Sequence, residues 1–218
     1  MAIGNIADKV IEADVLVIGG GIAGSFASIK ASEENVRVVT WEKAVVQRSG
    51  GASGGPQQWH GLPERTSTQE EMMETLTKGR AFAGGGGAGL QVDKLEGLRD
   101  KNFNAVLARD AWDRIYDLES WGVNMRWDDG EYNLLPDPAT GKRTELRYHG
   151  TGLKKKLSEQ IVKSRVELFE RTMAIDLLTQ NGAVVGATGF NIRTGEFIVC
   201  KAKAVVMATG WPTRTHYY

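Results

Sequence analysis

The sequence contains a single cysteine, and this scarcity removes several kinds of site. Cys200 is alone among 218 residues, so the chain can form no internal disulfide. It can provide neither a cysteine-ligated iron–sulfur cluster nor a cysteine-rich zinc site, and any such cluster would have to belong to another chain. Because Cys200 lies in a β-type segment, we expect it to serve as a small apolar residue of the core rather than as a reactive thiol.

The sequence also lacks an excess of charge and any long apolar run. Its 27 basic residues balance its 27 acidic residues, which gives no electrostatic case for nucleic acid or an anionic membrane as a partner. No stretch approaches the ~18 apolar residues of a membrane span, and residues 1–12 do not resemble a secretory signal. We therefore expect a cytoplasmic protein with no direct membrane insertion, whose 41% hydrophobic residues can form a sizeable core.

A β-strand, a glycine-rich turn, a helix and a second strand follow one another near the start of the chain. Residues 13–18 and 36–40 are short, β-branched runs typical of buried parallel strands. Between them, Gly19, Gly21 and Gly24 fit the pattern G-x-G-x-x-G. The first glycine permits the tight turn, the second lets the backbone approach a diphosphate, and the third allows close packing of helix and strand. The amide groups that begin the helix then face the phosphates, so the segment predicts a dinucleotide-binding unit.

An acidic residue follows the second strand, as this kind of unit requires. Glu42 lies 23 positions after Gly19, where its carboxylate would accept hydrogen bonds from the adenosine ribose and would repel a 2′-phosphate. The motif itself does not distinguish FAD from NAD. Two other features favour FAD: a Ser/Gly-rich loop at residues 48–56, and three β-type runs at residues 173–179, 183–192 and 196–201 that predict a meander.

Further helices and strands are predicted along the chain. A capping box of Ser67 and Glu70 indicates a helix over residues 67–80, and apolar spacing indicates helices over residues 102–121 and 151–164. Gly122 stands where a helix-ending glycine is expected. Short buried strands are predicted at residues 166–169 and 204–208, the latter followed by Thr209 and Gly210.

Several of these segments together resemble the succinate dehydrogenase/fumarate reductase flavoprotein family. The similar segments are DVLVIGGGIAGSFAS at 14–28, WEK at 41–43, RSGGASGG at 48–55, WGV at 121–123 and VVMATG at 205–210. Within the family, RYHGTGLKKKL at 147–157 and LFERTMAIDLL at 168–178 look most like the α subunits of adenylylsulfate reductases. The resemblance covers most of the chain except residues 82–102.

The resemblance implies an α/β fold, namely a glutathione-reductase-like Rossmann FAD-binding domain with a β-meander. Because members of the family are far longer, the domain is expected to be incomplete at its C-terminus. Residues 1–218 would then be the N-terminal part of a larger flavoprotein, with a mostly helical insertion at 61–148 and the meander with its returning strand at 166–210. In membrane-bound members a histidine after the Arg-Ser pair carries the flavin covalently, but Gly50 stands there in this sequence. We therefore expect noncovalent FAD.

The resemblance also assigns residues to the cofactor. The first glycines and the residues between them would hold the diphosphate, Glu42 and Lys43 the adenosine, the Ser/Gly loop the flavin side, and residues 172–174 the adenine. The expected cofactor-binding residues are Gly19, Gly21, Ile22, Ala23, Gly24, Glu42, Lys43, Ser49, Gly50, Gly51, Gly54, Gly55, Thr172, Met173, Ala174, Ala208, Thr209 and Gly210.

Three side chains are candidates for chemistry. His149 aligns with a family histidine near the flavin, where an imidazole could donate a proton or hold an anion, although a structural histidine at a strand end is an equal alternative. Arg147 could pair with an anionic substrate or could simply be exposed to solvent. His60, next to Trp59, could pack near the flavin, but an ordinary loop contact is favoured.

The leading functional hypothesis is a flavoprotein subunit of an oxidoreductase. It would pass electrons between FAD and a small anionic substrate, such as a dicarboxylate or adenylylsulfate, together with an iron–sulfur partner subunit. The alternative is a non-catalytic or split FAD-binding module that needs a second chain. A third possibility is an NAD-binding Rossmann domain without flavin.

Overall fold

The computed structural model describes residues 6–51, 54–55, 58–60, 62, 65, 68–71, 101–136 and 141–210. The chain divides into two compact units. Unit 1 comprises residues 1–54 and 152–218, and unit 2 comprises residues 55–151.

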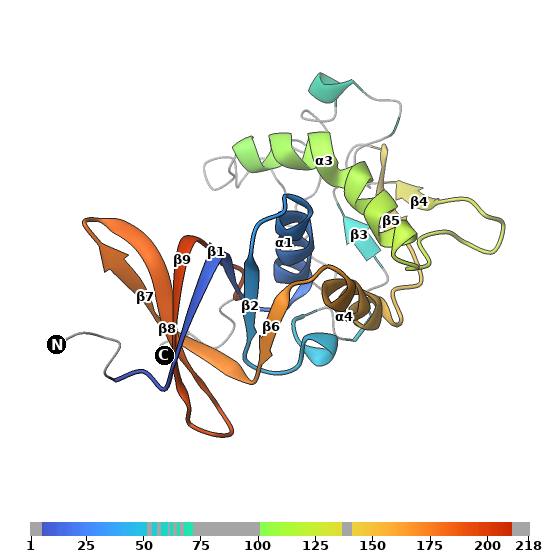
Figure 1. The fold of residues 1–218 in the computed structure, drawn as a ribbon. Helices are drawn as coiled ribbons and strands as arrows, with labels where there is room; N and C mark the ends of the chain where they lie inside the picture. Colours follow the sequence, from blue (N-terminus) through green and yellow to red (C-terminus); the bar gives the residue numbers. More distant parts are fainter. Residues whose placement is uncertain are drawn as a thin grey trace, which may run out of the picture. The chain divides into compact units, whose positions relative to one another are not determined.

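Unit 1 is built on a six-stranded sheet that runs in the order β6-β2-β1-β9-β8-β7 (Figure 1). The strands β6, β2, β1 and β9 run parallel to one another, whereas β7, β8 and β9 form an antiparallel meander. The strands are β1 (Lys9–Ile18), β2 (Val38–Glu42), β6 (Glu167–Glu170), β7 (Thr172–Gln180), β8 (Ala183–Asn191) and β9 (Phe197–Met207).

Strand β9 joins the meander to the parallel sheet, and it corrects one prediction from the sequence. The two runs at 196–201 and 204–208 are not separate strands but one strand of 11 residues. Its first half pairs with β8 on one side and with β1 on the other, and its second half continues along β1 as far as Met207. Strand β1 is correspondingly longer than the predicted run at 13–18, because residues from Lys9 onward have β9 as a partner.

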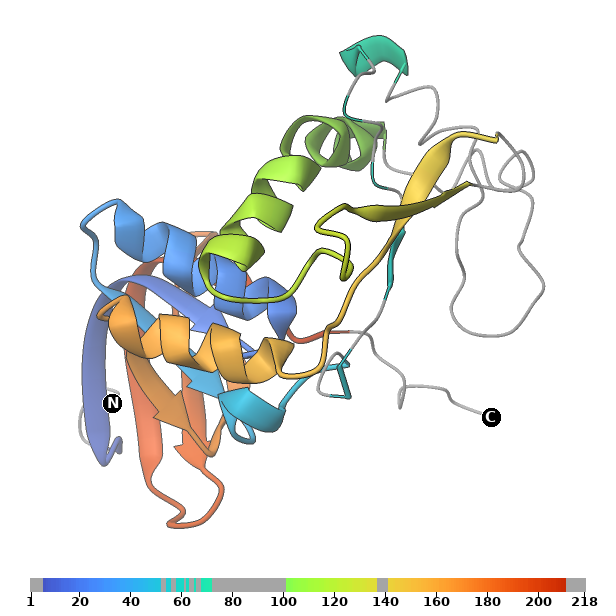
Figure 2. The same cartoon turned by 90° about the vertical axis from the view of Figure 1, so that its right-hand side faces the viewer.

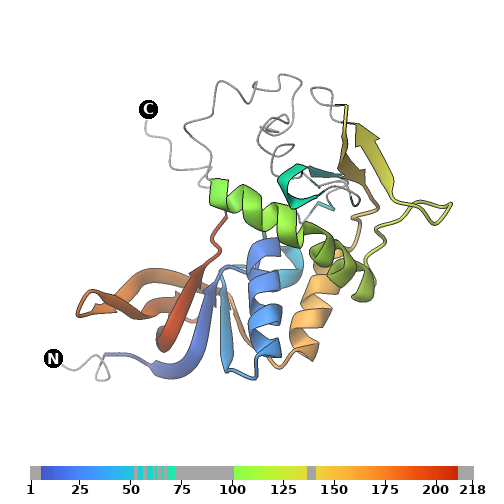
Figure 3. The ribbon, with the colours of Figure 1, turned by 90° about the horizontal axis from the view of Figure 1, so that it is seen from above.

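Two helices lie side by side against one face of this sheet (Figure 2, Figure 3). They are α1 (Ile22–Glu33) and α4 (Leu153–Lys163), and α4 also contacts the short 3-10 helix η2 (Val46–Arg48). Inside this layer, Ser28 Oγ and Thr40 Oγ1 share a hydrogen bond of 2.7 Å, which connects α1 to β2. The two small polar residues allow the helix to approach the strand closely while their hydroxyls satisfy each other.

The main hydrophobic cluster of unit 1 is formed by residues that alternate along β1, β2, β8 and β9. Leu16 and Cys200 are fully buried in it, and Trp41 is 1% exposed. Burial raises the pKa of the Cys200 thiol to about 11, so the thiolate form is scarce near neutral pH. The expectation that Cys200 is a core residue is therefore confirmed.

Unit 2 contains the helix α3 (Lys101–Ser120) and a three-stranded antiparallel sheet in the order β3-β5-β4. Its strands are β3 (Gln58–His60), β4 (Asn133–Pro136) and β5 (Arg143–Arg147), none of which was predicted. Gly122, with φ +85°, follows α3 in the left-handed conformation, and the amide of Val123 returns to the carbonyl of Leu118. This confirms the predicted helix end.

The described residues contain a capping box at Thr68 and Glu71, next to the predicted pair. The amide of Thr68 donates to Glu71 Oε2 at 2.8 Å, and the amide of Glu71 donates to Thr68 Oγ1 at 3.2 Å. Thr68 and Glu71 therefore make the reciprocal pair of a capping box, with the same spacing as Ser67 and Glu70. Ser67 lies outside the described residues. The rest of the helix predicted at 67–80 lies outside the described residues.

The fold class is as expected from the sequence: a mixed α/β unit with a parallel sheet, helices against it and a β-meander. The mostly helical insertion at 61–148 stays a prediction, since residues 72–100 lie outside the described part of the chain.

Candidate functional site

The glycine-rich turn connects β1 to α1 with little space for side chains. Gly19 has φ +105°, and a Cβ there would collide with the carbonyl oxygen of Ala208. A Cβ on Gly24 would collide with the carbonyl oxygen of Gly19. These two glycines are required by backbone contacts inside the protein, as the packing roles in the motif predict.

Gly21 differs from the other glycines of the turn. It is the N-cap of α1, has extended backbone angles and carries no side-chain cap. A Cβ on Gly21 would meet nothing closer than Gly50 Cα at 3.8 Å. The first turn of α1 contains no acidic residue, so its amide groups present an uncompensated partial positive charge. The free space at Gly21 is therefore available to a ligand.

Glu42 is the last residue of β2, and its side chain also anchors the glycine-rich turn. Its side chain is 6% exposed, and its two oxygens accept hydrogen bonds from separate backbone amides. Oε2 accepts from the amide of Gly20 at 2.6 Å, and Oε1 accepts from the amide of Ala44 at 2.7 Å. The carboxylate is thus fixed in place by the loops on both sides of it, which the sequence did not indicate.

The carbonyl of Gly20 is held by three donors. Lys154 Nζ lies 2.5 Å from this oxygen, Ser49 Oγ 3.1 Å and Ser25 Oγ 3.2 Å. Lys154 projects from α4 and is 3% exposed, an unusual position for a lysine. The sequence does not single out Lys154, because the surrounding LKKKL run gives no signal that one of its three lysines is buried.

A cavity of about 810 Å³ lies where β1, β2 and β9 end. In an open α/β sheet this edge, at the carboxyl ends of the parallel strands, is where ligands bind. Its lining includes most of the expected cofactor residues and adds side chains that were not predicted, among them Trp41 and Asp176. The lining residues are Ile18, Gly19, Gly21, Ile22, Ala23, Trp41, Glu42, Lys43, Gly50, Gly51, Thr172, Met173, Ala174, Ile175, Asp176, Leu177, Met207, Ala208, Thr209 and Gly210.

Four of the expected cofactor residues are not among those that line this cavity. Gly24 packs beneath the turn against Gly19, and Ser49 is buried, with its hydroxyl bonded to the Gly20 carbonyl. Gly54 ends the first segment of unit 1. Gly55 belongs to unit 2, where its φ is +78° and its Cβ position lies 3.1 Å from Thr151 Cα.

Gly50 lies against the second motif glycine. It has φ +82°, and a Cβ on it would lie 2.9 Å from Gly21 Cα. A side chain at this position would have to displace backbone atoms, and the left-handed conformation adds strain for any residue other than glycine. Gly50 therefore brings the Ser/Gly loop into close contact with the N-terminus of α1.

The candidates for chemistry lie in unit 2. His149 is exposed, and its ring stacks on that of Trp127 with the centroids 4.5 Å apart. Arg147 Nε donates to Glu145 Oε1 at 2.9 Å, within β5. The backbone of His60 pairs with that of Glu145, also on β5.

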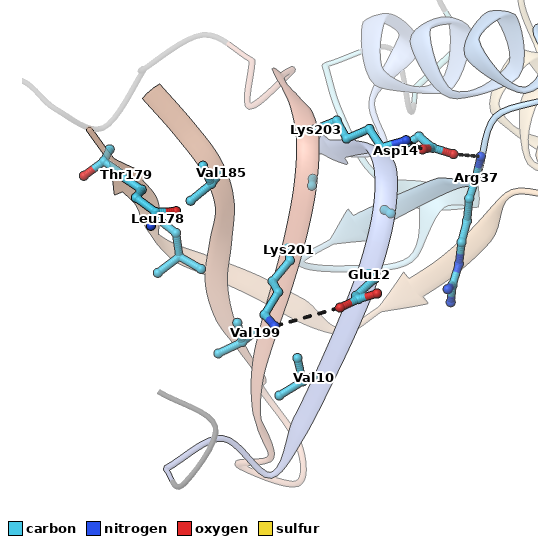
Figure 4. Close-up of a pocket in the computed structure, with 13 residues that line it drawn as sticks. Val10, Glu12, Asp14, Arg37, Leu178, Thr179, Val185, Val199, Lys201 and Lys203 are labelled. Atoms are coloured by element: carbon cyan, nitrogen blue, oxygen red, sulfur yellow. Dashed lines mark hydrogen bonds and ion pairs between the residues drawn. The ribbon is translucent and has the colours of Figure 1, made fainter. Parts of the chain in front are cut away.

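A second hollow, of about 950 Å³, is larger but differs in character (Figure 4). It lies over the first halves of β1 and β9 and over parts of β7 and β8, and its lining combines valines with charged groups. Lys203 and Asp14 pair at 2.7 Å, and Lys201 and Glu12 at 3.9 Å (Figure 4). Its charges are already matched, and none of the motif glycines lines it, so the smaller cavity is the candidate site.

Comparison with known proteins decides the family. The model of the family described as FAD binding domain matches residues 14–216. The chain belongs to this family. The cofactor expected from the sequence, FAD, is therefore the cofactor of the domain.

The relatives of this FAD-binding domain include reductase and dehydrogenase subunits. One subunit of a fumarate reductase (CoM/CoB) from Methanothermobacter marburgensis is 28% identical over 211 residues, which cover 93% of this chain and 36% of the relative. A succinate dehydrogenase flavoprotein subunit from Rickettsia bellii is 28% identical, with 94% and 34% covered. Adenylylsulfate reductase from Archaeoglobus fulgidus superposes with a TM-score of 0.76 at 29% identity, with 94% and 31% covered. The chain spans about a third of the length of each.

The residues of the smaller cavity fit FAD on physical grounds. The cavity has the size of a ligand site, and the open space at Gly21 lies at the uncapped N-terminus of α1, where an anionic diphosphate is favoured. Within the described residues, no helix is long and apolar enough to cross a membrane.

Proposed function

We propose that the chain is the FAD-binding part of an oxidoreductase flavoprotein of the fumarate reductase, succinate dehydrogenase and adenylylsulfate reductase type. One observation supports this most directly: a cavity at the strand ends, lined by the uncapped N-terminus of α1 and by Glu42, in a chain that belongs to the FAD-binding domain family. FAD, when bound, supplies the redox chemistry, while the residues of the chain bind and orient it.

We assign the cofactor contacts as follows. The Gly21 amide and the first turn of α1 hold the diphosphate, and residues 172–174 of β7 face the adenine. Each oxygen of Glu42 already accepts one backbone amide. Because a carboxylate oxygen has capacity for a second donor, Glu42 can also accept from the ribose hydroxyls. The loop around Gly50 and Gly51 lies on the flavin side.

The flavin is proposed to be noncovalent. No imidazole is available at Gly50, and a side chain there would collide with Gly21. Acid precipitation should therefore leave the yellow colour in the supernatant. Flavin absorbance that remains with the precipitated protein would contradict this assignment.

The substrate is proposed to be a small anion, and the electron partner an iron–sulfur subunit. The chain has a single cysteine, buried in β9, and among the described residues no group of His, Cys, Asp and Glu could hold a metal ion. These residues therefore offer no site for a cluster, and we propose that the cluster belongs to a partner subunit. His149 and Arg147 are the proposed substrate-facing residues, in which case Arg147 would exchange its contact with Glu145 for one with the anion.

Purification of the chain followed by reoxidation assays tests this function. We expect a yellow protein whose reduced flavin is reoxidised by a fumarate-like dicarboxylate. In the opposite direction, its oxidised flavin would be reduced by sulfite in the presence of AMP, which together give adenylylsulfate and two electrons. Flavin binding without exchange of electrons with either substrate would favour the alternative of a split or non-catalytic module. A colourless protein whose melting temperature rises with NAD and not with FAD would overturn the proposal.

A further inference from the structure

The peptide between Gly20 and Gly21 is restrained by groups that the glycine motif does not specify. Its carbonyl oxygen accepts from Lys154 Nζ, Ser49 Oγ and Ser25 Oγ. These donors come from α4, from the loop after η2 and from α1, so three separate segments converge on one oxygen. Lys154 contributes the shortest of the three contacts and the only charged one.

The direction of this carbonyl determines the direction of the next amide. In a planar trans peptide the C=O and N–H groups point in opposite directions, and the described residues contain no cis peptide bond. Because the Gly20 carbonyl faces Lys154 inside the protein, the Gly21 N–H faces the other way. Gly21 lines the cavity, so this N–H can donate to a ligand there.

A restraint of this kind is needed because both residues of the peptide are glycines. Glycine has access to a wide range of backbone angles, so a Gly-Gly peptide turns over more easily than one flanked by side chains. A charge-assisted hydrogen bond is stronger than a neutral one, and the Lys154 side chain that makes it here is buried. The positive charge of Lys154 also lies beside the N-terminus of α1, where it adds to the attraction for an anion.

We propose that Lys154 is a positioning residue of the FAD site, which holds the Gly20–Gly21 peptide so that the Gly21 N–H faces the diphosphate. This inference rests on the proposed binding of FAD at the cavity. It gives the buried lysine of α4 a role that neither the glycine motif nor Glu42 fulfils.

The electrostatic setting of Lys154 provides a measurable signature. Burial lowers the pKa of Lys154 to about 8, an effect that the carboxylate of Glu42 partly opposes. The other charged groups on the elements against α4 are Lys30 and Glu33 on α1, which pair with each other, and the exposed Arg48 of η2. On α4 itself the charged neighbours are Lys155, Lys156, Glu159 and Lys163.

A bound diphosphate favours the charged amine, so the pKa of Lys154 is higher in the complex than in the free protein. Binding then takes up a proton at any pH between these two pKa values. The affinity for FAD should therefore fall as the pH rises above about 8.

The test compares K154M with the matched control K155M, which removes an exposed lysine from the same helix. We expect K154M to weaken binding of FAD, and of ADP as a diphosphate probe, by about 10- to 100-fold, the range for a lost charged hydrogen bond. The urea midpoint of the free protein should be unchanged or higher, because an apolar side chain of similar length removes a buried charge while both serines still satisfy the Gly20 carbonyl. K155M should change neither quantity.

Further readouts separate positioning from simple structural support. In wild type the dissociation constant for FAD should increase as the pH is raised beyond about 8. In K154M it should stay constant over the same range. The ¹⁵N–¹H signal of Gly21 in the free protein should shift in K154M and stay in place in K155M. Equal FAD affinity in K154M and wild type, or parallel losses of stability and affinity, would overturn the inference.

Two further outcomes are also decisive. If K154M does not fold, the affinity of wild type for FAD is measured as a function of pH instead. An affinity that does not change above about pH 8 would then overturn the proposed role of Lys154. If wild type fails to bind FAD, the proposed function fails instead, and the Gly21 signal still decides whether Lys154 positions the peptide.

Discussion

Three glycines of one turn are required for different reasons. Gly19 and Gly24 meet backbone atoms of the protein itself, whereas Gly21 faces open space at the cavity. Gly20, at a position that the motif leaves free, also lacks room, because a Cβ there would lie 2.6 Å from Val46 Cγ2. Packing therefore requires Gly19 and Gly24, whereas Gly21 is the member of the motif that we propose contacts the ligand.

Substitutions at Gly21 and Gly24 should separate these two roles. Because Gly21 has extended backbone angles and open space around it, G21A should change the free energy of unfolding by less than about 1 kcal/mol while weakening FAD binding at least tenfold. G24A should lower the stability by about 1–3 kcal/mol or more, since its Cβ collides with the Gly19 carbonyl. Urea denaturation and flavin titration measure both effects. Normal FAD binding by G21A would show that the diphosphate does not approach this residue.

The carboxylate of Glu42 should be sensitive to an isosteric change. In E42Q one oxygen becomes an NH₂ group, which must face a backbone amide of Gly20 or Ala44 and leaves that donor without an acceptor. We expect a loss of about 1–3 kcal/mol of stability together with weaker FAD binding. E34Q, at an exposed carboxylate just after α1, is the matched control. Wild-type stability in E42Q would mean that Glu42 does not anchor the loop.

At the scale of the element, β9 connects the two halves of the sheet. It pairs with the antiparallel β8 and the parallel β1 over the same residues, so the meander and the βαβ unit share one strand. Gly186 on β8 allows this pairing, because it has φ +148° and a Cβ on it would collide with the carbonyl of Cys200 on β9. The backbones approach there more closely than any side chain permits.

Replacement of Gly186 should therefore disrupt the pairing of β8 with β9. G186A is expected to lower the melting temperature and to cost about 2 kcal/mol or more of stability, through backbone strain and steric overlap. Gly195, in the turn between β8 and β9, has φ +77° but open space around it, so G195N should be tolerated because asparagine accepts left-handed angles. Equal melting temperatures for the two variants would contradict this explanation.

At the scale of the whole molecule, unit 2 begins and ends at one place. Gly55 and Thr151 are its first and last residues, and they lie in backbone contact. An insertion whose ends meet in this way can be removed without stretching the chain around it. Unit 1, with its own six-stranded sheet and hydrophobic cluster, then has the features of a unit that folds by itself.

Excision of unit 2 tests this organisation. Joining Gly55 to Thr151 through a short glycine linker should give a protein with a cooperative unfolding transition and the circular dichroism of an α/β fold. The same linker inserted at the exposed Asn181–Gly182 turn of the intact chain provides a control for the linker itself. A broad, non-cooperative transition in the excised form alone would show that unit 1 needs unit 2.

The sequence predicted this site well where chemistry depends on neighbouring residues along the chain. The strand, the glycine turn and the helix from Gly19 to Gly24 follow from local backbone requirements, and the acid at the end of the next strand follows from a fixed spacing. The meander was visible from alternation and turn residues. Strands β3 to β5 of unit 2 were missed because they are short, and β3 pairs with β5, which lies far from it in the sequence.

The sequence by itself therefore determined the turn after β1, where we propose that FAD is bound, because the required backbone geometry is encoded by adjacent glycines. Only the tertiary structure decided which groups hold that turn in place. Lys154 lies 134 positions from Gly20 along the chain, and it looks like its two lysine neighbours until α4 packs against α1. Burial and direction arise from that packing, and they distinguish one buried cation of the site from exposed lysines on the same helix.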